Sequence, residues 1–270
     1  MFDRSRLGVV SNCWQQQLAE GQPLEALIER AVTDCGFRQI ELRQGALGRL
    51  EDGNRLPDTA ALTRLAAAFP QVGFDLAVEL PVFSESVTRD HPHRQRYLDA
   101  AAALSGHLRI VDLTPCSLTE ATDDWLSLVT ENLLALTDDL PQGLVSVEHS
   151  VQPWSVFWPA FERARADHKS TLKLCFDPTN LWLTGDGVRA ADITRHVPVD
   201  SLSMVHLKQR RGSAVLPSFG PGDVAWRELL PLFQTHSYSG PYLFEIAPGA
   251  SVWEELEAGV RFLDDLLATQ

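Results

Sequence analysis

The sequence predicts an α/β protein folded as a single (β/α)8 TIM barrel, and three observations lead to this prediction. Short apolar segments alternate with longer amphipathic ones along all 270 residues, as in parallel sheets with crossover helices. Eight apolar segments follow one another in this way. No Pro-, Gly- or Ser-rich linker divides the chain, and such barrels run to about 250 residues as one domain. We therefore expect one barrel domain over residues 1–270.

The expected strands are rich in Val, Ile, Leu and Phe and lack strict alternation, as is typical of parallel strands covered on both faces. They are Leu7–Val10, Gln39–Leu42, Gly73–Val78, Leu108–Leu113, Leu144–Val147, Leu172–Phe176, Ser203–Leu207 and Tyr242–Ile246. An open doubly wound sheet is the alternative. Its phosphate-binding fingerprint, G-x-G-x-x-G after the first strand, is absent from this sequence.

The segments between the expected strands repeat apolar residues every three or four positions, which indicates amphipathic helices. One helix is expected to end at Gly36, and Gly106 follows another, because glycine favours the left-handed conformation after a helix. Asp58 is the expected N-cap of the segment DTAALTRLAAAF, and Asp223 that of DVAWRELLPLF. The segment WEELEAGVRFLDDLLA, which begins at Trp253, closes the chain.

Composition limits the classes of partner. The formal net charge of −13 opposes binding to nucleic-acid phosphates and to anionic membrane surfaces. The four cysteines form no Cys-x-x-Cys pair, the first residues do not resemble a signal peptide, and no apolar run approaches the ~20 residues of a membrane span. We expect a cytoplasmic protein with no nucleic-acid or membrane partner.

The last four expected strands end in residue types that bind metals. Glu148, Asp177, His206 and Glu245 are separated by 29, 29 and 39 residues, each close to one strand–helix unit. The carboxyl ends of barrel strands share one mouth, so these four side chains should meet there. Taken singly, each is more often a cap, an ion-pair partner or a buried histidine. Together they predict one divalent-metal site.

The composition of this group indicates which metal it prefers. Three carboxylates and one imidazole form an oxygen-rich set that suits Mn²⁺ best, with Mg²⁺, Co²⁺ or Zn²⁺ as alternatives. A structural zinc site would favour cysteine thiolates in a closed shell. Here water or substrate oxygens can complete the shell.

At these residues the chain resembles the xylose isomerase-like barrel family, the sugar isomerases and epimerases related to endonuclease IV. The resemblance covers the whole chain and depends on the motifs IELR, VEHS, FDPTN, VHLKQ, GPGDVAW and FEI. It implies that the same four residues are the metal ligands and that Glu148 and Glu245 act as paired acid/base groups. It also implies assembly into homo-oligomers.

The chain departs from the family's pattern at two places. Many members carry a histidine shortly after the aspartate of the sixth strand, where this chain has Pro178, Thr179 and Asn180. After the motif His-x-Lys the family often has aspartate, and here Gln209 stands instead. Both changes bear on the substrate and leave the four ligand positions intact.

Further site residues are expected around the same mouth. Lys208 lies two positions beyond His206, hence on the same strand face, and is a candidate catalytic residue or an ion-pair partner of a ligand carboxylate. The candidate substrate-binding residues each have a structural alternative, namely capping, ion pairing or packing. They are Glu41, Asn180, Trp14, Trp182 and His149.

The pattern predicts a metal-dependent isomerase or epimerase that acts on a small sugar or sugar-like hydroxy-ketone through an enediolate. The same chemistry serves a lyase, either a keto-inositol dehydratase or a β-keto sugar-acid decarboxylase, which we keep as the alternative. A non-catalytic sugar-binding or partner subunit is the third possibility. In each case the expected ligand is a small carbohydrate or sugar acid.

Overall fold

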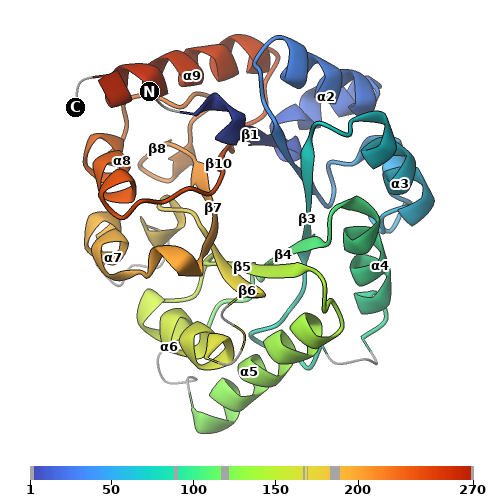
Figure 1. Cartoon of the computed structure of the whole chain (residues 1–270), viewed down its shortest axis with the longest axis vertical. Coiled ribbons are helices and arrows are strands. Elements are labelled where there is room, and N and C mark those ends of the chain that lie inside the picture. Colours follow the sequence, from blue (N-terminus) through green and yellow to red (C-terminus); the bar gives the residue numbers. More distant parts are fainter. Residues whose placement is uncertain are drawn as a thin grey trace.

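The structure is a computed structural model that describes residues 3–87, 91–116, 122–166, 168, 170–182 and 189–268. Eight parallel strands form a closed barrel in the order β1-β10-β7-β6-β5-β4-β3-β2 (Figure 1). They are β1 (Leu7–Val10), β2 (Gln39–Arg43), β3 (Gly73–Glu79), β4 (His107–Val111), β5 (Leu144–Glu148), β6 (Leu172–Phe176), β7 (Leu202–Leu207) and β10 (Tyr242–Phe244). The predicted fold class is therefore confirmed.

Helices surround the barrel (Figure 1). The α-helices are α1 (Gln15–Ala19), α2 (Leu24–Thr33), α3 (Thr59–Ala68), α4 (Arg94–Leu104), α5 (Asp123–Asp138), α6 (Trp154–Arg165), α7 (Ala190–His196), α8 (Trp226–Thr235) and α9 (Val252–Ala268). Short 3-10 helices are η1 (Arg4–Arg6), η2 (Ser11–Trp14), η3 (Gly48–Leu50), η4 (Asn180–Trp182) and η5 (Val199–Ser201). A small hairpin, β8 (Arg210–Arg211) with β9 (Ala214–Val215), lies between β7 and α8.

Most of the predicted local signals act as expected. Gly36 has a φ of +72° just after α2, and the Asp58 side chain accepts a hydrogen bond from the Ala61 N–H at 3.0 Å at the start of α3. The prediction for Asp223 is wrong. Helix α8 begins at Trp226, and the Asp223 carboxylate instead accepts from the Gly212 N–H at 2.7 Å, so it ties the hairpin to the following loop.

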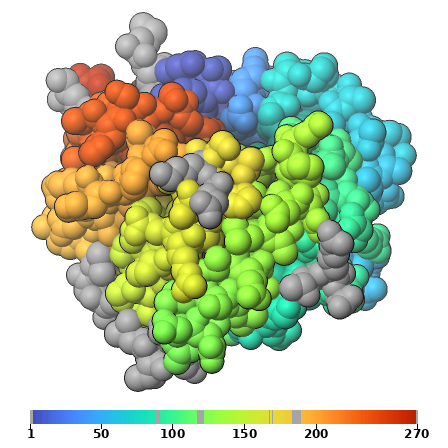
Figure 2. Space-filling view, turned by 60° about the horizontal axis from the view of Figure 1, so that its bottom comes forward, coloured from blue at the N-terminus to red at the C-terminus, as the bar shows by residue number. Residues whose placement is uncertain are grey.

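The first and last strands close the barrel. Leu7 of β1 lies in register with Tyr242 of β10, and the N-terminal segment (blue) lies beside the C-terminal segment (orange to red) in the ribbon and space-filling views (Figures 1 and 2). In the described part of the chain, no helix is both long and apolar enough to cross a membrane.

Strand alternation separates two apolar regions. The large cluster fills the space between the barrel and its helices, with residues such as Val9, Leu174 and Phe244. A small second cluster, made of Val10, Cys175, Met204 and Leu243, lies inside the barrel. The last three precede Asp177, His206 and Glu245 by two positions, and so share their strand face. An apolar layer thus underlies the predicted metal ligands.

Candidate metal centre

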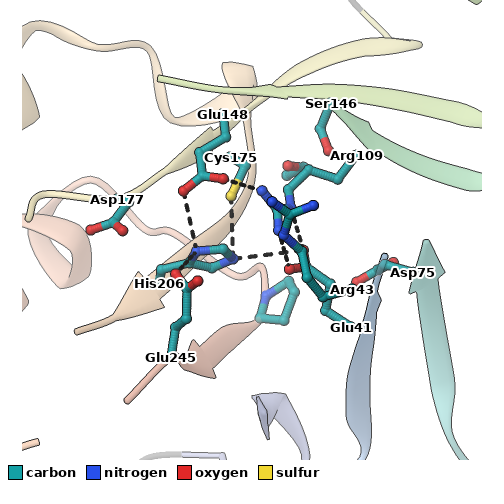
Figure 3. A network of polar contacts seen from close by, with 12 residues as sticks. Glu41, Arg43, Asp75, Arg109, Ser146, Glu148, Cys175, Asp177, His206 and Glu245 are labelled. Carbon is teal, nitrogen blue, oxygen red and sulfur yellow. Dashed lines mark hydrogen bonds and ion pairs between the residues drawn. The ribbon is translucent and has the colours of Figure 1, made fainter. Parts of the chain in front are cut away.

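The four predicted ligands lie close together at the barrel mouth, and we call them the mouth cluster. Glu148 ends β5, Asp177 follows β6, His206 lies in β7 and Glu245 follows β10. One ligand atom from each lies within 4.8 Å of the other three (Figure 3). Two ligands at about 2.1 Å from one ion lie at most about 4.2 Å apart. Small side-chain movements therefore suffice to place all four atoms on a single cation.

His206 is fully buried in the middle of this cluster. Its Nδ1 lies 3.1 Å from Glu245 Oε2, and its Nε2 lies 3.3 Å from the sulfur of Cys175. Burial raises the pKa of the Cys175 thiol to about 12, so the sulfur remains protonated. The imidazole is therefore oriented with Nδ1 towards the carboxylates of the mouth cluster.

Lys208 lies among the ligands, as its predicted position on the His206 face implies. Its Nζ is 3.2 Å from Asp177 Oδ2 and 3.0 Å from Glu245 Oε2. Burial opposes the charged form, but the carboxylates of Asp177 and Glu245 outweigh it and raise the pKa of the ammonium. The structure thus shows the ion-pair alternative for Lys208.

Arg109 of β4 is a site residue that the sequence analysis missed. Its Nε donates to Glu41 Oε2 at 2.7 Å, its Nη2 donates to Glu41 Oε1 at 2.5 Å, and its Nη1 donates to Glu148 Oε2 (Figure 3). Burial raises the pKa of Glu41, but the Arg109 charge outweighs this and brings it to about 2. The sequence did contain a signal for this residue, because Arg109 is a charged residue between Leu108 and Ile110 in an apolar strand.

The charges of this group do not cancel. Glu41 and the three carboxylates of the mouth cluster face two fixed cations, Arg109 and Lys208. Burial lowers the pKa of His206, but its neighbours, the carboxylates Glu41 and Glu245 among them, outweigh this and raise it, so a proton on the imidazole compensates part of this charge in the metal-free site. With the neutral imidazole that a metal ion requires, two negative charges remain in a buried region. Buried charges require partners or a metal ion, and a divalent cation supplies the missing charge. The residues present therefore fit such an ion.

Two asparagines donate hydrogen bonds to the glutamate ligands. Asn180 Nδ2 donates to Glu148 Oε1 at 2.9 Å and to the His149 carbonyl at 3.0 Å. Asn12, which the sequence analysis missed, donates to Glu245 Oε1 at 2.8 Å. Hydrogen bonds of this kind orient metal ligands in many proteins. Asn180 thus contacts a predicted ligand directly.

The two glutamate ligands differ electrostatically. Burial raises the pKa of Glu148, against the opposing charge of Arg109. Burial also disfavours ionisation of Glu245, but Lys208 and His206 outweigh it and hold its pKa well below the ordinary value. The metal-free site therefore contains one carboxylate that is easy to protonate and one that is hard to protonate.

Three of the predicted substrate-binding residues have no exposed surface. Glu41 is fully buried, and both its oxygens accept from Arg109 rather than from Arg43. Trp14 is fully buried and stacks on Trp253. The buried His149 ring packs against Trp154 and Phe157, and its Nε2 lies 2.7 Å from the Gln152 carbonyl. The structure therefore does not support direct substrate contact at these three positions. Strand alternation or loop packing turns each of the side chains inward.

Trp182 is the predicted aromatic that remains accessible. Its side chain is 59% exposed, and the Arg210 guanidinium lies 5.7 Å from its ring centroid. It borders a pocket of about 430 Å³ that is also lined by Leu181, Val224 and Leu229. An apolar face is thus available next to the loop that follows Asp177.

Gln209 organises the loop between the β8–β9 hairpin and α8. Its Nε2 donates to the Gly220 carbonyl at 2.8 Å, and its Oε1 accepts from the Val224 N–H at 2.9 Å. A Cβ at Gly222 would approach the Gln209 side chain to 2.4 Å, so only glycine fits there without a shift. The departure from the family's aspartate therefore serves loop structure.

Comparison with family models and with curated protein sequences gives no match. Solved structures do match. The IolI protein, described with a bound zinc atom, superposes with a TM-score of 0.71 at 13% identity over 98% of each chain. The fold is that of the xylose isomerase-like TIM barrels.

Other barrels of this fold match over similar lengths. D-allulose 3-epimerase from Methylomonas sp. has a TM-score of 0.66 at 15% identity, over 98% of this chain and 99% of that one. The "probable 3-DHS dehydratase AsbF" of petrobactin synthesis in Bacillus anthracis has a TM-score of 0.70 at 12% identity, over 96% and 98%. Such identities show a shared fold alone.

One match is much longer than this chain. A xylose isomerase-like TIM barrel/4-hydroxyphenylpyruvate dioxygenase fusion protein superposes with a TM-score of 0.71 at 16% identity. The comparison covers 98% of this chain and 43% of the fusion protein.

Proposed function

We propose that this protein is a divalent-metal-dependent isomerase or epimerase of a small sugar or sugar-like hydroxy-ketone. The observation that carries the proposal is the convergence of the mouth cluster at the carboxyl ends of the strands of a closed barrel, where four carboxylates, including Glu41, face two fixed cations. Mn²⁺ is the preferred ion because oxygen ligands dominate, and Mg²⁺, Co²⁺ or Zn²⁺ also suits the set. The zinc atom described for the IolI protein supports a metal on this fold.

A divalent cation held by these residues would supply Lewis acidity to a substrate carbonyl or hydroxyl oxygen. Glu148 ends β5 and Glu245 follows β10, and these strands are separated in the barrel by β6 and β7, so the two carboxylates approach a bound substrate from different directions. One carboxylate removes the proton next to the carbonyl, and the other returns a proton to the resulting enediolate. The Lys208 ammonium is placed to hold a substrate oxygen or to stabilise its negative charge.

Small carbohydrates are the substrates that best suit this arrangement. The exposed ring of Trp182 offers an apolar face to a sugar, and the polar mouth offers hydrogen bonds. A D-allulose complex is described for the Methylomonas epimerase with the same fold. A cytoplasmic location and assembly into homo-oligomers remain predictions of the sequence.

A metal-dependent lyase is the second candidate, and the position of Lys208 favours it. Elimination of water requires a base near the C–H bond and an acid near the departing hydroxyl. Lys208 Nζ lies 3.0 Å from Glu245 Oε2, so an acid and a base are adjacent on one side of the site. The dehydratase of Bacillus anthracis with this fold supports this candidate.

A proton-exchange screen separates these functions. The metal-free protein is loaded with manganese and incubated in deuterated water with a panel of ketoses, keto-inositols and keto acids, and products are followed by NMR. Deuterium incorporation without loss of water or carbon dioxide supports an isomerase or epimerase, whereas either loss supports a lyase. Tight sugar binding without exchange would contradict both and indicate a binding subunit.

A further inference from the structure

We propose that Arg109 is a positioning residue. Glu41 anchors its guanidinium, and the guanidinium holds Glu148 so that this carboxylate binds the metal through one oxygen only. This inference rests on the proposed metal centre. It assigns a role to two buried residues that the acid–base chemistry does not use, Glu41 and Arg109, which form an ion-pair network with Glu148. We call this network the arginine clamp.

The hydrogen bonds define what the clamp holds. Two nitrogens of Arg109 bind both oxygens of Glu41, a bidentate pairing that fixes the plane of the guanidinium. The remaining Nη1 donates to Glu148 Oε2. The other oxygen, Glu148 Oε1, then lies on the His206 side, 3.8 Å from Nδ1. Glu148 therefore turns a single oxygen towards the other ligands.

Burial makes this arrangement rigid. The side chains of Arg109, Glu41 and Glu148 are 1%, 0% and 6% exposed, so water cannot replace any of the three partners. A buried charge that loses its partner is strongly destabilising. Arg109 thus cannot release Glu148 without leaving a carboxylate uncompensated inside the barrel.

The clamp also explains why Glu41 stands apart from the mouth cluster. Its Oε2 lies 3.6 Å from His206 Nε2, close enough to compete as a ligand. Both its oxygens are occupied by Arg109, however, and the metal-ligand group contains only the other three carboxylates among the described residues. Glu41 therefore serves as the anchor of the guanidinium.

In the part of the chain that the structure describes, Glu245 has no equivalent of the clamp. Its outer oxygen accepts from the neutral amide of Asn12, and its other oxygen contacts Lys208, whose ammonium ends a flexible chain. Of the two glutamate ligands, Glu148 alone is held by a planar guanidinium from the described residues. The structure therefore distinguishes a fixed ligand from a more adjustable one.

The test is metal binding by the full chain, measured by calorimetric titration of Mn²⁺ into metal-free protein and by electron paramagnetic resonance of the bound ion. The double variant E41Q/R109M removes one negative and one positive charge, so the total charge of the site is unchanged. Glu148 is then the one carboxylate that loses its cation, and it keeps its hydrogen bond from Asn180. We expect it to fold and to bind Mn²⁺ about 10- to 100-fold more weakly, the usual cost of losing an outer partner of a ligand.

Two single variants complete the design. R109K keeps the charge but cannot bind Glu41 and Glu148 together with the same geometry, so its affinity should also fall and its Mn²⁺ spectrum should change. R94K is the matched control, because Arg94 is also buried and ion-paired, with Asp139, but belongs to helix α4 outside the site. Its Mn²⁺ affinity should equal that of the wild type.

The outcomes separate the two proposals. Wild-type Mn²⁺ affinity and spectrum in E41Q/R109M, or in R109K should the double variant not fold, would mean that Arg109 only balances the charge of Glu41, and would overturn the clamp while leaving the metal centre. Failure of the wild-type protein to bind Mn²⁺ at millimolar concentration would overturn the metal centre and the clamp together.

Discussion

Among the described residues, the barrel interior contains two groups that combine a carboxylate with an imidazole, and they differ in charge and in position along the strands. In the mouth cluster, three carboxylates surround His206. In the second group, which we call the inner triad, Asp75 Oδ1 lies 2.5 Å from His107 Nδ1, and His107 Nε2 lies 2.7 Å from Ser146 Oγ. The inner triad has the connectivity of a hydrolase triad, yet Ser146 is fully buried. A substrate cannot reach its hydroxyl.

The comparison shows that residue types alone do not mark a functional site. Each side chain of the inner triad has a partner inside the triad, and together they contain one carboxylate. The mouth cluster concentrates carboxylates that the nearby cations leave only partly compensated, at the carboxyl ends of the strands, where barrel enzymes have their active sites. Unbalanced charge and location therefore identify the functional group.

Removal of one metal ligand from the mouth cluster should have the largest effect, a loss of Mn²⁺ affinity. Asp177→Asn keeps the size of the side chain but deletes a charge that the ion requires. We expect Mn²⁺ affinity to fall by more than ~100-fold, beyond the cost of losing an outer partner, while the thermal unfolding of the metal-free protein changes little. Calorimetric titration measures the first quantity. Unchanged affinity in D177N would remove Asp177 from the ligand set.

The acid–base proposal predicts the next largest effect. Glu148→Gln and Glu245→Gln should each lower turnover by ~10²-fold or more on the substrate that the screen identifies, since acid–base groups contribute typically ~10²–10⁴-fold. Steady-state rates at saturating manganese are the measurement. Near-wild-type turnover in either variant would exclude that residue from proton transfer.

A substitution in the inner triad should instead lower stability and leave metal binding unchanged. Ser146→Ala removes the hydroxyl next to His107 Nε2 and leaves a largely buried ring nitrogen without its partner, which costs about 1–3 kcal/mol. We expect the free energy of unfolding in urea to fall by that amount, with Mn²⁺ affinity unchanged. A large loss of metal binding in S146A would show that the two groups are coupled.

Acid should weaken the network next to the mouth cluster. The folded pKa of Glu41 is about 2, below its ordinary value of 4.5, so the folded state binds fewer protons than the unfolded state between these values. The stabilisation from ionised Glu41 is complete above about pH 4.5 and is lost as the pH falls towards 2. Without metal, the free energy of unfolding in urea should depend less steeply on pH in E41Q/R109M than in the wild type. Equal dependence would contradict the pKa assignment.

The sequence by itself determined the barrel and the four residues of the mouth cluster. Strands of parallel barrels are continuous apolar segments, and their carboxyl ends share one mouth, so a regular spacing of Glu148, Asp177, His206 and Glu245 along the chain becomes proximity in space. The caps at Gly36 and Asp58 were equally predictable, because they depend on neighbouring residues only.

Only the tertiary structure decided the partners of these residues. Arg109, Glu41 and Asn12 come from β4, β2 and the loop after β1, and no pattern along the chain shows which side chains meet across the barrel interior. The buried positions of Trp14 and His149 had the same cause, since packing between segments far apart in sequence sets exposure. Asp223 joined the hairpin rather than a helix for this reason as well. Local signals act over a few residues, whereas the charge balance of a buried site depends on every strand that faces it.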